Sequence, residues 1–141
     1  MLRLPIALLF LATPALAEVT ITDARLVAAF PNAKAGALYL TLKSDAGDMM
    51  IGVHADDAMA MLHETVEDDG VMRMEHVGEI AVQADEPLVM EPGGLHVMMM
   101  GLTPEMLEAE TVEVRLIFRE QGEVPVEARV QIGVHAEGKT E

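Results

Sequence analysis

Short segments in which polar and apolar residues alternate dominate this chain. Three of them are clear: residues 37–43 (ALYLTLK), 111–118 (TVEVRLIF) and 124–132 (VPVEARVQI). A period of two is typical of strands with one buried face, and turn-forming residues separate these runs at short intervals. No stretch carries an apolar stripe with helical period over three turns. We therefore expect an all-β fold, an antiparallel β-sandwich or barrel.

At most a short helical turn is expected within this all-β chain. The best candidate is Thr103-Pro104-Glu105, where threonine can cap a helix and proline suits its first position.

The first 17 residues have the features of a secretory signal peptide. Arg3 precedes a short apolar run, residues 4–12, and Ala15-Leu16-Ala17 is a cleavage motif of the small-x-small type. This run is much shorter than the roughly 20 residues that span a hydrocarbon core, so a membrane anchor is the less favoured alternative. We expect cleavage after Ala17 and no membrane insertion afterwards. One domain then occupies residues 18–134, and a short polar tail follows at 135–141.

The absence of cysteine excludes several kinds of site. None of the 141 residues is cysteine, so no disulfide, no cysteine-linked lipid and no cluster on cysteine thiolates can form. A His₂Cys blue-copper centre is excluded for the same reason. The net charge of −15 disfavours nucleic acid as a partner, because phosphates repel an acidic surface. The only serine is Ser44, and no P-loop or HExxH motif is present, so we do not expect an enzyme.

Histidine occurs twice among methionines, which number 12 in this chain. Residues 59–66 and 71–77 flank the turn-like stretch 67–70, and a four-residue hairpin loop there would place His63 directly opposite Met74. Opposed residues on one face have Cβ atoms about 4.5–5.5 Å apart, close enough to hold one ion. The same register predicts that Met61 pairs with His76 and that Thr65 pairs with Met72.

The second group lies in residues 93–102, GGLHVMMMGL. In an extended strand His96, Met98 and Met100 point to one side, whereas Val97 and Met99 point to the other. Imidazole and thioether two residues apart form a compact pair of ligands. Calcium and magnesium prefer oxygen, zinc prefers cysteine, histidine and carboxylate, and soft thioethers select Cu(I), with imidazole as a suitable partner. A His₂Met₂ set therefore suits Cu(I).

The other methionines and histidines have simpler interpretations. Methionine packs well into irregular cores, and we expect that role for Met49, Met50, Met59, Met90, Met99 and Met106. His54 is expected to be solvated, as are the carboxylates at 56–57 and 67–69. The alternative function is a metal-free β-sandwich module for binding or adhesion, with the methionines as core. It stays open whether Met61, Met72, His76 or Met100 also line a copper site.

The spacing of the four candidate ligands resembles the signature of a known family. His63, Met74, His96 and Met98 form the pattern H-x10-M-x21-H-x-M, which resembles that of the periplasmic copper chaperones called PCuAC. Four further stretches are similar to the same family: GALYLTL from Gly36, LHE from Leu62, GVMRM from Gly70 and EPGGLHVMMMGL from Glu91. The resemblance spans roughly residues 35–132, most of the chain.

This resemblance implies a cupredoxin-like, Greek-key β-sandwich in the periplasm that binds Cu(I) through the four matching residues. It implies delivery of copper towards cytochrome c oxidase assembly, with an oxidase subunit or a Sco-type chaperone as the accepting protein. Some relatives carry a long C-terminal extension rich in histidine and methionine. The tail here is short, with His135 as its one possible ligand, so a second site for Cu(II) is not expected there.

Overall fold

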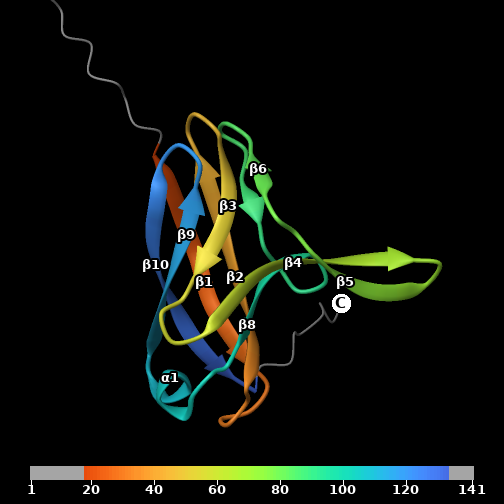
Figure 1. The fold of residues 1–141 in the computed structure, drawn as a ribbon, viewed down its shortest axis with the longest axis vertical. Helices are drawn as coiled ribbons and strands as arrows, with labels where there is room; N and C mark the ends of the chain where they lie inside the picture. Colours follow the sequence, from red (N-terminus) through yellow and green to blue (C-terminus); the bar gives the residue numbers. More distant parts are fainter. Residues whose placement is uncertain (1–17, 134–141) are drawn as a thin grey trace, which may run out of the picture.

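The computed structural model describes residues 18–133. They form ten strands and one short helix (Figure 1): β1 (Val19–Ala28), β2 (Ala35–Ser44), β3 (Asp48–His54), β4 (Met59–Asp68), β5 (Val71–His76), β6 (Ile80–Val82), β7 (Leu88–Val89), β8 (Leu95–Met100), α1 (Pro104–Glu108), β9 (Thr111–Phe118) and β10 (Gly122–Ile132). The predicted signal peptide and the polar tail with His135 lie outside the described residues. No helix within 18–133 is long and apolar enough to cross a membrane.

The strands join edge to edge in one continuous sheet that folds over on itself. Its order is β5-β4-β8-β2-β1-β10-β9-β3-β6, with β7 paired to β2. Figure 1 shows β3 and β9 in front of β1 and β2. The core lies between these layers, where Leu26, Leu38 and Leu116 are fully buried. The expected all-β sandwich is confirmed, although one pair, β1 with β10, is parallel.

The three segments with alternating polar and apolar residues form strands that bury every second side chain. Residues 111–118 are β9, and Val112, Val114, Leu116 and Phe118 point into the core while the residues between them face outwards. The other two runs lie within β2 and β10. Burying every second side chain of a strand stabilises the fold by about 1.5–3 kcal/mol for each large apolar residue.

Helix α1 begins where the sequence predicts. The Thr103 side chain accepts a hydrogen bond of 3.3 Å from the Met106 backbone N–H, and Pro104 occupies the first turn. Such a cap satisfies a donor that the first helical turn leaves free. The helix buries Leu107 against the core at one end of the sandwich.

The hairpin of β4 and β5 projects from the body of the sandwich (Figure 1). Its predicted four-residue loop is wrong, because Asp68 pairs with Val71 and only Asp69 and Gly70 form the turn. Both turn residues have positive φ, 55° and 78°, as a two-residue turn of type I′ requires.

The predicted pairs across this hairpin are wrong by two residues. His63 pairs with His76, Thr65 pairs with Met74, and Met72 pairs with Glu67. Because side chains alternate with a period of two, an even shift leaves them all on their expected face of the hairpin.

The methionines predicted to fill the core differ in how deeply they are buried. Met50, Met90 and Met99 are buried, as predicted, and Met106 packs partly against the core. Met59 is not core, because 59% of its surface is exposed at the start of β4. Met49 is half-buried at the edge of β3. The exposed Met59 therefore needs another explanation.

Candidate metal site

Three histidines lie in a row across adjacent strands. His63 on β4 pairs with His76 on β5 and with His96 on β8, so β4 holds the middle ring. The ring centroids of His63 and His96 are 6.2 Å apart, and those of His63 and His76 are 5.7 Å apart. Histidines far apart in the sequence thus meet on one face, because β8 inserts between β4 and β2.

Two thioethers flank this row. Met98 lies two residues along β8 from His96, on the same side of the strand, and pairs with Met61 of β4. Met74 and Thr65 form a pair of the hairpin, two pairs closer to its turn than His63 and His76, and therefore the next pair on the same face. A cleft of about 430 Å³ has Met74, His96 and Met98 in its wall. The register therefore brings together the side chains predicted to hold copper, His63, Met74, His96 and Met98.

His63 has a buried nitrogen that forms no hydrogen bond. Its Nδ1 is inaccessible to solvent and has no partner within residues 18–133. Buried polar atoms are nearly always paired, so an unpaired one calls for a physical reason. A metal ion bound to His63 would satisfy an imidazole nitrogen that the protein itself leaves unpaired. Together with the two thioethers, this imidazole forms a donor set that fits a soft ion.

The His96 ring is fixed by the backbone. Only 6% of this residue is exposed, and its Nδ1 lies 3.0 Å from the carbonyl oxygen of Gly94. A neutral imidazole that donates from Nδ1 keeps Nε2 as its free acceptor, the arrangement common in metal-binding histidines. Gly93, with φ of 83°, forms the turn that brings this carbonyl into place.

Besides Met74, the sequence prediction also misplaced His76. Instead of facing Met61, it faces His63, and its Nδ1 lies 3.2 Å from the carbonyl oxygen of Leu62. The Asp69-Gly70 dipeptide was the available signal, since Asp-Gly is among the strongest indicators of a two-residue hairpin turn.

Tyr39 lies beside His96 in the wall of the same cleft, with Arg25 over its ring, an arrangement that the sequence did not indicate. The Tyr39 ring centroid lies 6.3 Å from that of His96, and the Arg25 guanidinium lies 5.4 Å from the Tyr39 ring centroid. Burial raises the pKa of Tyr39, and the charge of Arg25 opposes this rise in part. Tyr39 is therefore a neutral phenol at physiological pH and adds no negative charge beside the imidazoles.

Histidine and carboxylate side chains alone form no metal cluster in the described part of the chain, the histidine row included. Within residues 18–133, no three side chains of histidine, aspartate or glutamate gather in a way that could hold a metal ion. His54 is exposed, as expected, and its Nε2 lies 3.3 Å from Asp56. Asp56 is exposed too and also forms an ion pair with Arg115.

Solved structures with the same fold are PCuAC domains. The copper-bound PCuAC domain from PmoF2 is 23% identical, with a TM-score of 0.65 over 84% of this chain and 96% of that one. The apo PCuAC domain from PmoF1 is 18% identical, with a TM-score of 0.64 over 84% of this chain and 97% of its own. Apo-DR1885 from Deinococcus radiodurans is 27% identical, with a TM-score of 0.61 over 99% and 97% of the two chains.

Sequence comparison gives the family directly. No curated protein matches the chain. Residues 19–130 match the model of the LpqE-like family, described as "Putative lipoprotein LpqE-like", and this match covers most of the chain. The all-β sandwich, its likeness to PCuAC domains and the family match agree, and the chain belongs to the LpqE-like family, the family of PCuAC domains.

Proposed function

We propose that this protein is a periplasmic copper chaperone that binds Cu(I) through His63, Met74, His96 and Met98. The observation that supports this most directly is the strand register, which places two imidazoles and two thioethers from β4, β5 and β8 on one face. The unpaired Nδ1 of His63 and the copper-bound relative from PmoF2 add to it. Neutral sulfur and nitrogen ligands suit a soft monovalent ion.

The exposure of the ligands suits a carrier better than a permanent site. His96 is buried, while Met74 is 55% exposed at the rim, on the projecting strand β5. A partner protein can displace an exposed thioether first and then take the ion from the remaining ligands. An enzyme would instead need a substrate pocket with groups for chemistry, and we propose no catalytic role.

Competition titration against a Cu(I) chelator tests the ligand set. His63→Ala and Met74→Ala are expected to lower the Cu(I) affinity at least tenfold each, since losing one ligand costs more than about 1.4 kcal/mol. The matched controls are His54→Ala and Met72→Ala, which remove the same side-chain types from exposed positions outside the set. Equal affinity in all four variants would reject this ligand set, and a wild type that does not bind Cu(I) would favour the metal-free binding module.

Delivery towards cytochrome c oxidase assembly is the proposed role of the bound ion. The acceptor would be an oxidase subunit or a Sco-type chaperone, and the export signal proposed for residues 1–17 would place the exchange in the periplasm. Mixing the Cu(I)-loaded protein with a purified acceptor domain and separating the two tests this directly. Copper that stays on the donor with every such acceptor would contradict the delivery step, but not the binding site.

A further inference from the structure

A row of methionines runs along β4 and β8, from the proposed copper site to the ends of these two strands. On β4 and β8, three successive pairs lie on the same face: His63 with His96, Met61 with Met98, and Met59 with Met100. No bulge interrupts the pairing from Met59 to Glu64, so the alternation of side chains is intact across the row. We call Met59, Met61 and Met100 the methionine row; Met98, the partner of Met61, belongs to the proposed His₂Met₂ site.

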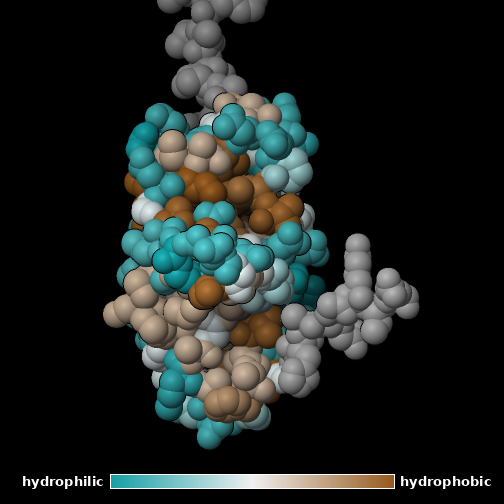
Figure 2. Space-filling model, turned by 90° about the vertical axis from the view of Figure 1, so that its right-hand side faces the viewer, coloured by the Kyte–Doolittle hydropathy of each residue, from teal (hydrophilic) through white to brown (hydrophobic). Residues whose placement is uncertain are grey.

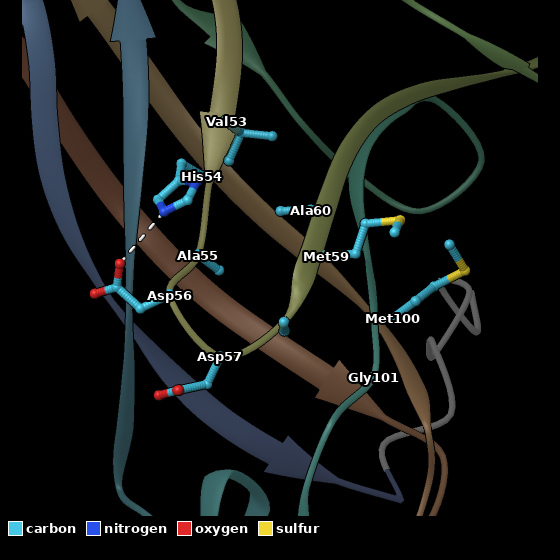
Figure 3. Close-up of a pocket in the computed structure, with 10 residues that line it drawn as sticks. Val53, His54, Ala55, Asp56, Asp57, Met59, Ala60, Met100 and Gly101 are labelled. Atoms are coloured by element: carbon cyan, nitrogen blue, oxygen red, sulfur yellow. Dashed lines mark hydrogen bonds and ion pairs between the residues drawn. The ribbon is translucent and has the colours of Figure 1, made fainter.

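The geometry of the strands brings these thioethers within reach of one another. Paired side chains have Cβ atoms about 4.5–5.5 Å apart, and successive pairs on one face are about 7 Å apart along the strands. A methionine side chain has three rotatable bonds, so three sulfurs can converge on one ion between two such pairs. Figure 3 shows Met59 and Met100 extending side by side from the ends of their strands.

The row is open to solvent, unlike the methionines of the core. Met59 is 59% exposed, and Met61 and Met100 are half-buried, whereas Met99, on the other side of β8, is fully buried. On the next strand, Ala35 pairs with Met100 and Ala37 pairs with Met98, and these small side chains leave the thioethers uncovered. Packing therefore does not account for the row.

The surroundings suit a cation that must reach and leave the protein. The cleft beside Met59 and Met100 also has His54, Asp56 and Asp57 in its wall (Figure 3). Asp56 pairs with Arg115, so the negative potential comes from Asp57 and from the net charge of −15. Figure 2 looks onto the side from which the β4–β5 hairpin projects and shows hydrophobic surface above and below a polar band. An acidic surround draws cations in, and soft sulfur then selects among them.

We propose that Met59, Met61 and Met100 form a second, weaker site for Cu(I), from which the ion passes by way of Met98 to the His₂Met₂ site or returns. This inference rests on the proposed function, because it treats the second site as the exchange point of a copper carrier. Three neutral thioethers without imidazole bind more weakly than the mixed set, so this site loads second and empties first. No bond is made or broken except those between ion and ligands.

Nuclear magnetic resonance of the full-length protein with ¹³C-labelled methionine methyl groups tests the site in the wild type. Ag(I) serves as the probe, because it is a soft, monovalent d¹⁰ ion that does not change its oxidation state. The first equivalent is expected to shift the Met74 and Met98 signals, and the second the signals of the methionine row. Met72, exposed on β5 opposite Glu67, should not move with either. A second equivalent that leaves the row unshifted would overturn the inference.

A matched pair of triple variants then tests stoichiometry with Cu(I) and a chelator. Met59→Leu/Met61→Leu/Met100→Leu removes the row, and Met49→Leu/Met72→Leu/Met106→Leu removes as many methionines elsewhere; leucine conserves the volume of methionine closely. Wild type and control should bind two ions, and the row variant one, with the tighter affinity unchanged. A row variant that still binds two ions overturns the inference. If that variant also fails to transfer copper to a partner, the row is a docking surface and not a metal site.

The variant His63→Ala/His96→Ala separates this inference from the proposed function. It should lose the tighter site and keep the shifts of the methionine row on addition of Ag(I). If instead the tighter site survives in this variant, the proposed His₂Met₂ site is wrong, and the Ag(I) shifts of the methionine row then decide the second site by themselves. If the tighter site is lost and the row does not respond, the second site is rejected and the first is retained.

Discussion

At the scale of single residues, the candidate ligands differ in what else they do. Met74 is 55% exposed and contributes little to packing, whereas His96 is buried and bonds to the Gly94 carbonyl. Without copper, Met74→Ala is expected to change the free energy of unfolding by less than about 0.5 kcal/mol, and His96→Ala to lower it by about 1–3 kcal/mol. Urea unfolding of the two apo variants measures this, and equal losses would contradict the difference in burial.

Gly36 shows how closely β1 and β2 approach one another. A Cβ at this position would lie 2.8 Å from the carbonyl oxygen of Val27 and 3.2 Å from side-chain atoms of Leu26 and Leu102. Gly36→Ala is therefore expected to destabilise the fold by about 1–3 kcal/mol, because backbone atoms must move apart. The control is Gly78→Ala, where a Cβ meets nothing within 4 Å. Thermal unfolding compares them, and a Tm for Gly36→Ala as high as that of the control would refute this contact.

At the scale of elements, β5 is the strand that copper should change most. All six of its residues are exposed, it is an edge strand of the sheet, and among residues 18–133 it pairs only with β4. Edge strands without buried side chains open locally at low cost, so β5 amides should exchange rapidly in the apo protein. Cu(I) bound through Met74 should slow that exchange and leave β9, in the core, unchanged. Hydrogen exchange by mass spectrometry tests this, and identical β5 exchange with and without copper would show that Met74 is not a ligand.

At the scale of the whole molecule, binding of Cu(I) should raise the free energy of unfolding. An ion that binds only the folded protein stabilises it by about 2.7 kcal/mol at 100 times its Kd. Cu(I) should therefore raise the Tm by several degrees, whereas Ca²⁺ should not, because thioethers bind hard ions poorly. Scanning calorimetry with each ion is the measurement. An equal rise with Ca²⁺ would point to the acidic surface, not to sulfur, as the site of binding.

The local features of this fold were readable from the sequence because each depends on neighbouring residues only. Alternation of polar and apolar residues located β2, β9 and β10. Threonine before proline located the start of α1, since a cap and its helix are one local motif. The preference of the candidate ligands for a soft ion could also be predicted from the sequence, because it depends only on the type of each side chain.

Only the tertiary structure decided which of these side chains meet. The β4–β5 pairing depends on two left-handed turn residues, Asp69 and Gly70, and a loop two residues shorter than expected moved Met74 opposite Thr65. The contact of His63 with His96 depends on β8 lying between β4 and β2, a non-local choice that closes the core. Alternation says which face of a strand is buried, but not which strand lies beside it. For that reason the exposed Met59 and its pairing with Met100 became visible only in the folded sheet.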